Sequence, residues 1–141
     1  MSKASDLARL MTSGSTAIHG EAGVTSSGST GLTTNLQQGL SKHWVNLDGD
    51  ASGVGARDSF NSSSTTDNGT GNYDSSYTNA MSNANYMVCG TGAHDAPISS
   101  NRDRIFQAVS ESSALMNINF FDDSAQRDQN FTYGASFGDL A

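Results

Sequence analysis

Three runs within residues 42–92 decide the fold: KHWVNLD (42–48), RDSFNSSSTTDNGTGNY (57–73) and NANYMVCG (83–90). In the first run His43, Val45 and Leu47 occupy every second position, which is typical of a strand with one buried face. Inside the second run, the dipeptide Asn68-Gly69 suits the positive φ angles of a tight hairpin turn. The stretch therefore predicts antiparallel strands joined by short polar turns.

Other strand-like runs continue this pattern toward the C-terminus. They cover Ala56–Ser63 with Phe60 as its anchor, Tyr73–Met81, Asn85–Cys89, Ile105–Ser110, Leu115–Phe121 and Asn130–Phe137. Residues 85–89 carry apolar side chains on both faces, which predicts a covered central strand. Ala93–Asp103, with the sole proline Pro97, and Asp122–Asp128 are expected to be loops.

In two of these runs the period-two spacing indicates which residues share one face of the strand. Met116, Ile118 and Phe120 are predicted to point inward from the strand over 115–121. Phe131, Tyr133, Ala135 and Phe137 share one face of the last strand by the same spacing. Alternation of this kind is typical of strands in layered sheets.

Composition supports an all-β fold. Ser, Thr, Gly and Asn account for 62 of the 141 residues, and these residue types favour turns and polar pleated surfaces over helix interiors. About seven short strands at intervals of roughly 8 to 15 residues predict an antiparallel β-sandwich, jelly-roll-like, over residues 41–141.

Residues 1–40 are predicted to form a helix followed by an extended arm. Ser2 can cap a helix over 2–11, in which Leu7, Leu10 and Met11 form one apolar stripe. Such a short helix is marginal alone in water, so the stripe is expected to dock on a partner. Residues 12–39 have isolated apolar positions that fit no regular period, which predicts an arm that becomes ordered against its neighbours.

The charge and the apolar content narrow the possible partners. A net charge of −7 and scattered Lys and Arg residues argue against a nucleic-acid partner. No secretory leader or membrane-spanning run is visible, so we expect no membrane insertion. Hydrophobic residues make up 35% of the chain, which predicts a thin core in a lone monomer and burial against copies of itself.

Cysteine and histidine give little sign of a reactive site. Cys89 is the only cysteine, so no internal disulfide can form, and we expect Cys89 to be a small buried side chain. The Gly-x-Ser-x-Gly elbow of a serine nucleophile is absent. His19, His43 and His94 lack metal-cluster spacing, although a trimer could bring copies of one His or Asp together on its axis.

The sequence DGDASG (48–53) matches the first half of a calcium loop, with Asp48, Asp50 and Ser52 as candidate ligands. The match fails at its twelfth position, where Ser59 stands in place of a bidentate Glu. A polar turn is therefore favoured, and no metal or other cofactor is expected.

Carboxylates offer the only catalytic alternative. Asp122 and Asp123 are adjacent, Asp128 is nearby and Asp103 lies in an earlier loop. Two such groups in a cleft could serve a small carbohydrate-active enzyme. Adjacent loop acids among Ser and Asn are more typical of a solvated surface, so a non-enzymatic protein is the favoured interpretation.

The runs KHWVNLDG (42–49), ARDSFNSSSTTDNGTGNY (56–73) and AMSNANY (80–86) resemble a module found near the C-termini of tailed-bacteriophage fibre and other virion structural proteins. In that family a Lys-x-Trp-Val-Asn strand precedes an Arg-x-Ser-Phe-Asn-Val-Ser-Ser strand and an Asp-Asn-Gly-Thr-Gly turn. The order and spacing match over residues 41–92, and residues 3–10 resemble the leader segments of such fibres. The tail over 122–141 extends beyond the family's pattern.

This resemblance implies a trimeric, β-rich virion component that is assembled in the host cytoplasm and has no catalytic residues. It would be a short tail fibre or fibre-like appendage, attached to other virion proteins through Leu7, Leu10 and Met11. Loops with His94, Asp95, Arg102, Asp122, Asp123 and Arg127 would face a host-surface glycan. The alternative is a head fibre, capsid decoration or neck protein of the same virion.

Overall fold

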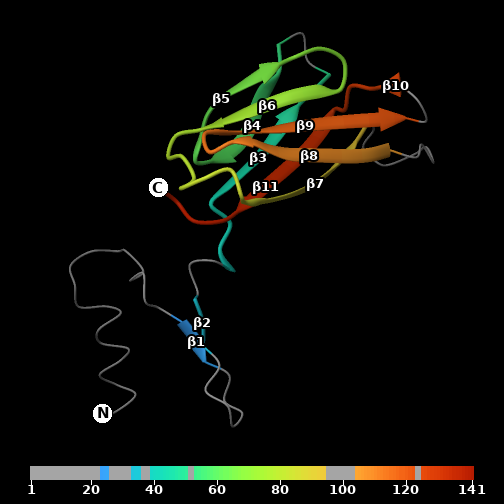
Figure 1. Cartoon of the computed structure of the whole chain (residues 1–141). Coiled ribbons are helices and arrows are strands. Elements are labelled where there is room, and N and C mark those ends of the chain that lie inside the picture. The colour runs from blue at the N-terminus through green and yellow to red at the C-terminus, as the bar shows by residue number, and fades with distance from the viewer. Residues whose placement is uncertain (1–22, 26–32, 36–38, 51–52, 95–103, 123–124) are drawn as a thin grey trace, which may run out of the picture. The chain divides into compact units, whose positions relative to one another are not determined.

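The structure is a computed structural model that describes residues 23–25, 33–35, 39–50, 53–94, 104–122 and 125–141 (Figure 1). The chain divides into two units, Met1–Leu40 and Ser41–Ala141. None of the described residues belongs to a helix long and apolar enough to cross a bilayer.

The first unit contains a short β-ribbon. Strand β1 (Gly23–Thr25) pairs antiparallel with β2 (Thr33–Asn35), and Val24 lies opposite Thr34. The apolar spacing of the predicted extended arm did not reveal these two strands, because backbone pairing between two Thr-containing segments needs no apolar period of its own. The predicted helix with Leu7, Leu10 and Met11 lies outside the described residues.

The second unit is all-β and consists of two antiparallel sheets, as expected for a β-sandwich. The first sheet has the order β4-β3-β11-β7, with bounds Gly55–Phe60, His43–Asp48, Phe131–Phe137 and Met87–Ala93. The second has the order β5-β6-β9-β8, with bounds Ser62–Asp67, Asn72–Tyr77, Leu115–Asp122 and Arg104–Ser112. The short β10 (Ala125–Gln126) also pairs with β9.

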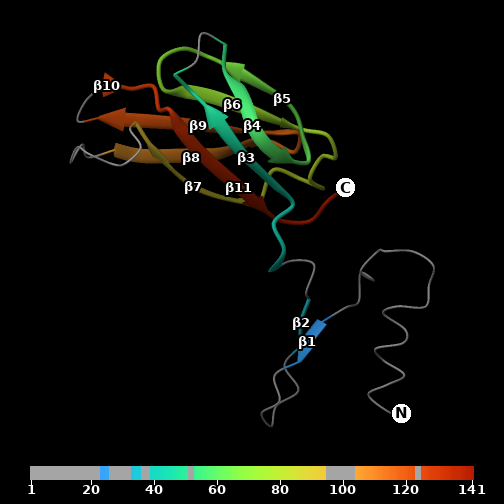
Figure 2. The same cartoon turned by 180° about the vertical axis from the view of Figure 1, so that it is seen from behind.

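The two sheets lie face to face, and their strands cross (Figures 1 and 2). Figure 2 shows the sheet of β3, β4, β7 and β11 from its outer side. Side chains from both sheets fill the interior of the sandwich. A candidate binding site is therefore expected on an outer face such as this one.

The core lies between the sheets and consists largely of every second side chain along β3, β6 and β9. Its buried members are Val45, Leu47, Tyr73, Tyr77, Met81, Tyr86, Met116, Ile118 and Phe120. The inward predictions for β3 and β9 are therefore confirmed. Burial of apolar area contributes roughly 25 cal/mol per Å², so these strands contribute much of the sandwich's stability.

The inner face of β11 is small and polar, in contrast to its outer face. Thr132, Gly134 and Ser136 are buried, whereas the aromatic residues of β11 alternate with them. A Cβ on Gly134 would lie 2.7 Å from the Met116 Cε atom. Because β9 already fills that space, β11 turns its large side chains outward.

A sheet-to-sheet corner interrupts the run predicted as one strand over 56–63. Asn61 separates β4 from β5 and has a φ of 58°, a left-handed conformation that Asn tolerates better than most residues. Its Nδ2 donates to the Lys42 carbonyl at 2.9 Å, and its Oδ1 accepts from the Asn79 N–H at 2.7 Å. These bonds fix the point at which the chain leaves one layer for the other.

The β5–β6 hairpin forms at the predicted Asn68-Gly69 turn. Gly69 has a φ of 115° and Gly71 a φ of 67°. The Asn68 N–H donates to the Asn72 carbonyl at 2.9 Å, and Asp67 Oδ1 accepts from the Gly69 N–H at 2.9 Å. The following strand ends at Tyr77 rather than at Met81.

Three other expectations were wrong. Strand β7 lies at the edge of its sheet, and Met87 is 57% exposed, so residues 85–89 are not a covered central strand. Cys89 is exposed rather than buried. The expected loop 122–128 contains the end of β9 and β10.

Candidate functional site

The outer face of the β4-β3-β11-β7 sheet carries an exposed apolar surface. The exposed fractions are 37% for Trp44, 54% for Phe60, 57% for Met87 and 40% for Tyr133. The strand register pairs Phe60 with Trp44, Trp44 with Ala135, and Ala135 with Cys89. A row of apolar side chains therefore crosses all four strands, and an exposed patch of this kind is typical of a binding surface.

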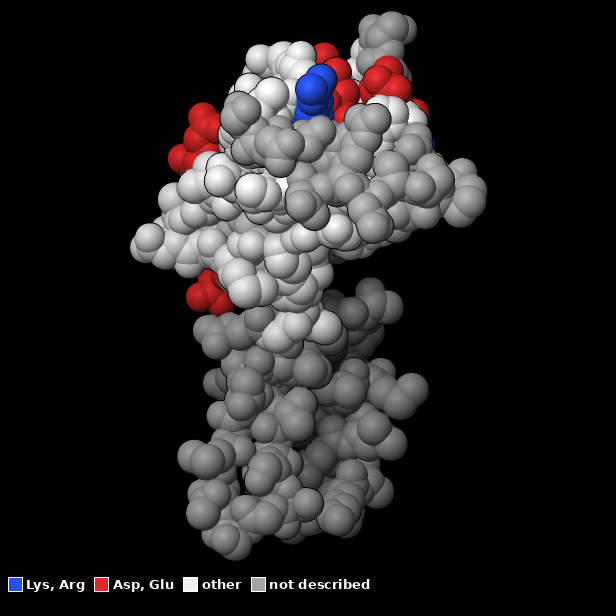
Figure 3. All heavy atoms as spheres, turned by 90° about the vertical axis from the view of Figure 1, so that its right-hand side faces the viewer, with Lys and Arg blue, Asp and Glu red and all other residues white. Residues whose placement is uncertain are grey.

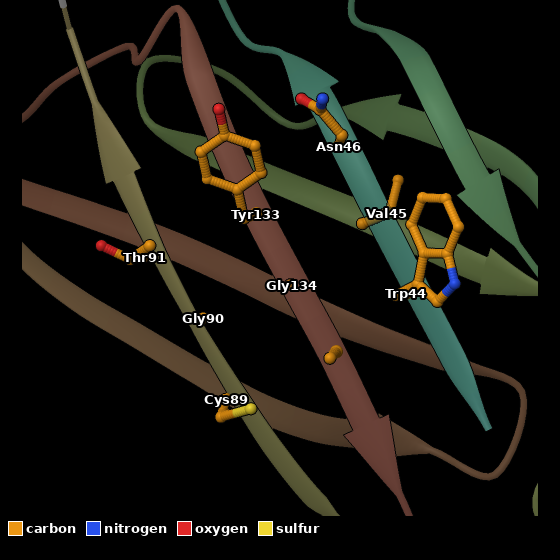
Figure 4. Close-up of a pocket in the computed structure, with 9 residues that line it drawn as sticks. Trp44, Val45, Asn46, Cys89, Gly90, Thr91, Tyr133 and Gly134 are labelled. Atoms are coloured by element: carbon orange, nitrogen blue, oxygen red, sulfur yellow. The ribbon is translucent and has the colours of Figure 1, made fainter. Parts of the chain in front are cut away.

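A shallow depression of about 410 Å³ lies on this face, over β3, β11 and β7 (Figure 4). Its lining residues are Trp44, Val45, Asn46, Cys89, Gly90, Thr91, Tyr133, Gly134 and Ala135. We call it the outer-face depression. Its low part follows the small residues Ala135 and Cys89, which continue the register row of Trp44 across β11 and β7, beside the row that contains Tyr133.

Glycines form part of the floor of the outer-face depression. A Cβ on Gly90 would lie 2.1 Å from the Tyr133 carbonyl oxygen and 2.6 Å from the Phe106 ring. Glycine at this position therefore lets β8 pack closely behind β7. The packing of Phe106 on β8 against Gly90 supports the floor of the depression from the inner side of the sheet.

The polar groups of the depression are neutral. Asn46 lies opposite Tyr133 in the register, and its Oδ1 has no hydrogen-bond partner among the described residues. Thr91 adds a hydroxyl from β7, and the lining contains no Asp, Glu, Lys, Arg or His. The site can therefore accept a neutral ligand with an apolar face and hydroxyl groups, but it has no group to pair with a charged one.

Arg57 and Asp48 form an ion pair on the same sheet. The Arg57 Nη2 atom lies 2.6 Å from Asp48 Oδ2, and the guanidinium lies 4.7 Å above the centre of the Phe131 ring. Arg57 also donates to the backbone carbonyls of Leu47 and Asn130. The carboxylate of Asp48 is thus engaged by a cation from its own chain.

The other calcium candidates receive no support from the geometry. Asp50 is exposed, and Ser52 lies outside the described residues. Within the described ranges, no three His, Cys, Asp or Glu side chains gather closely enough to hold a metal ion.

His43 lies inside the sandwich. It is fully buried, its Nε2 lies 2.9 Å from Ser75 Oγ, and its ring centre lies 4.5 Å from that of Tyr77. Burial lowers the pKa of His43 from 6.5 to about 4, so the ring is neutral at pH 7. Because Ser75 is also fully buried, this Ser–His pair is closed to substrates, and His43 cannot reach an oligomer axis.

Asp128 has a structural role. Its Oδ1 accepts from the Gly71 N–H at 2.7 Å and lies 3.1 Å from the Tyr73 hydroxyl, which also lies 3.0 Å from the Gly49 carbonyl oxygen. Burial raises the pKa of the Tyr73 hydroxyl, so it remains a proton donor. This network ties the β5–β6 turn to the segment before β11.

Of the remaining catalytic candidates, only the backbone of Asp122 can be placed. Asp122 ends β9, where its backbone pairs with Arg104 and Ala125. Asp103 and Asp123 lie outside the described residues.

Only part of the predicted receptor-facing set can be placed. The His94 carbonyl accepts from Asn130 Nδ2 at 2.8 Å, and the Arg127 N–H donates to the Phe120 carbonyl at 3.1 Å. Asp95, Arg102 and Asp123 lie outside the described residues. On the side drawn in Figure 3, most of the described surface is uncharged and acidic side chains occupy parts of its edge.

The sequence prediction missed the outer-face depression. Its signal was present in β11, where aromatic residues alternate with Thr132, Gly134 and Ser136, and in Trp44, which alternates with buried Val45. This alternation groups the large side chains on one face, but contacts with β9 decide that the face is the outer one.

No family model, no curated protein and no solved structure matches this chain.

Proposed function

We propose that the chain is a non-enzymatic structural component of a tailed-phage virion, namely a short trimeric tail fibre or fibre-like appendage that contacts the host surface. The observation that carries this proposal is the exposed apolar outer face with Trp44, Phe60, Met87 and Tyr133. On a chain rich in Ser, Thr, Gly and Asn, such a face supports binding to another surface.

The chemistry of the described residues favours binding over catalysis. The buried His43 and the half-buried Asp128 are both held by internal hydrogen bonds, and Asp48 is paired with Arg57. The outer-face depression offers aromatic and neutral polar groups instead. These are the groups that recognise a ligand without transferring a proton to it.

The sequence resemblance connects this binding module to virions. The resembling stretch, residues 41–92, supplies β3, β4, β5, β6 and most of β7, including Trp44 and Cys89 of the outer-face depression. In the proposal, residues 1–40 attach the module to the particle through Leu7, Leu10 and Met11. The 35% hydrophobic content supports three chains sharing buried surface.

The trimer can be tested on the purified chain by size-exclusion chromatography with light scattering. We expect a species of about three times the 14.7 kDa chain mass at micromolar concentration. Mass spectrometry of purified particles should find the chain among the virion proteins. A stable monomer in dilute buffer would contradict the trimer, and absence of the chain from particles would contradict the structural role.

A further inference from the structure

We propose that the outer-face depression binds the ring of a neutral sugar, with Trp44 and Tyr133 as its stacking surfaces and Asn46 as its hydrogen-bonding group. This inference rests on the proposed host-contacting function and deepens it, because it replaces the predicted loops with a defined surface. The ligand class is an uncharged, hydroxyl-rich pyranose within a surface glycan.

The two aromatic rings have the arrangement that a sugar ring requires. Figure 4 views the sheet from its outer side and shows Tyr133 on β11 and Trp44 on β3, both with their ring faces turned toward the viewer. Ala135, two positions after Tyr133 on β11, lies opposite Trp44 in the register. A pyranose presents a face of C–H groups that packs on such rings, while its hydroxyl groups project from its edge.

Asn46 supplies the polar part of the site. It lies opposite Tyr133, and Figure 4 shows its oxygen on the Tyr133 side of the amide. This Oδ1 has no hydrogen-bond partner among the described residues, and an unpaired, shielded acceptor is costly in a folded protein. A small rotation of the Asn46 side chain would let a sugar hydroxyl donate to it.

The charges favour a neutral sugar over an anionic ligand. Asp58 lies opposite Asn46 in the register, and the lining itself has no cation. An anionic glycan would therefore meet repulsion without a compensating partner.

The site contains two unique reporters, because Trp44 is the chain's only Trp and Cys89 its only Cys. The full-length chain is titrated with methyl glycosides and short oligosaccharides of glucose, galactose, mannose and N-acetylglucosamine. Sialyllactose and a sulfated disaccharide serve as charged comparisons. We expect at least one neutral saccharide to produce a saturable change in Trp44 fluorescence and to slow alkylation of Cys89.

Variants then assign the binding to this face. We expect Tyr133→Ala to weaken binding about tenfold and Asn46→Ala about fivefold, both measured by Trp44 fluorescence. Val109→Ala is the matched control, because Val109 is 54% exposed but lies on β8 of the other sheet. It should leave the affinity unchanged, and circular dichroism should show that all three variants remain folded.

Several outcomes would overturn this inference. They are the absence of a saturable response to every neutral saccharide, binding of the charged saccharides alone, and equal effects of Tyr133→Ala and Val109→Ala. A shift of Trp44 fluorescence with protein concentration in the absence of sugar would instead show that copies cover the face, and it would also overturn the inference. None of these results contradicts a structural role in the virion, which particle composition tests separately.

Discussion

Replacing Phe120 with Ala is expected to destabilise the sandwich by about 4 kcal/mol. Phe120 is fully buried in β9, and its ring lies edge-on to that of Phe106, with 5.4 Å between the ring centres. It also lies directly below Gly92 of β7, where a Cβ would be 2.5 Å from the Phe120 ring. The truncation would therefore leave a cavity that touches both layers.

Urea unfolding followed by circular dichroism measures this loss. Because single domains have a total stability of roughly 5 to 15 kcal/mol, the variant should unfold at a much lower urea concentration. Phe60→Ala removes the same side chain from a position that is 54% exposed, and we expect it to cost less than about 1 kcal/mol. Equal losses in the two variants would contradict the assignment of Phe120 to the core.

Acidification is expected to remove about 3 kcal/mol of stability through His43 alone. Burial depresses the pKa of His43 in the folded state to about 4, below its ordinary value of 6.5. The unfolded chain therefore binds the proton first as the pH falls. The stability held by neutral His43 is complete above about pH 6.5, decreases between pH 6.5 and pH 4, and stops decreasing below that range.

The measurement is the free energy of unfolding between pH 7.5 and 3.5 for the wild type and His43→Gln. The two proteins have the same carboxylates, so the difference between their curves isolates His43. We expect His43→Gln to flatten the curve between pH 6.5 and 4. The same slope in the wild type and His43→Gln would show that His43 does not titrate as a buried group.

The strands with a fully buried face could be predicted from the sequence. In β3, Val45 and Leu47 are 2% and 0% exposed, and in β9 Met116, Ile118 and Phe120 are each 0% exposed. A shift of the strand register by one residue would turn this whole set of side chains toward solvent. The apolar positions in the sequence must therefore coincide with the buried positions in the structure. The Asn68-Gly69 turn was predictable for a different reason, namely its requirement for positive φ angles.

The candidate site was not predicted, because periodicity groups residues on a face without saying which face is inside. In β11 the spacing correctly placed Phe131, Tyr133, Ala135 and Phe137 together. That this set faces outward depends on Met116 and Ile118 filling the space below Gly134, which is a contact between distant segments. The break at Asn61 was missed because polar residues flank it and only its backbone conformation marks the corner.

Strand β7 shows that the apolar pattern of a segment also fails to identify an edge strand. Apolar residues on both faces suggested a covered strand, yet among the described residues β7 pairs with β11 alone and leaves Met87 and Cys89 exposed. In this sheet the apolar outer side chains belong to a surface rather than to a second core. The prediction failed because an exposed apolar face and a buried face can have the same composition in a short segment.

The proposed virion role is tested most directly by a reconstruction of the intact particle in which the proposal places this chain, at a resolution that traces the backbone. We expect three copies of the sandwich in each appendage, attached through residues 1–40, with Trp44 and Tyr133 facing away from the particle. A particle that lacks the chain would contradict the structural role. Particles in which Trp44 and Tyr133 are buried against another virion protein would contradict the outer face as the surface that meets the host.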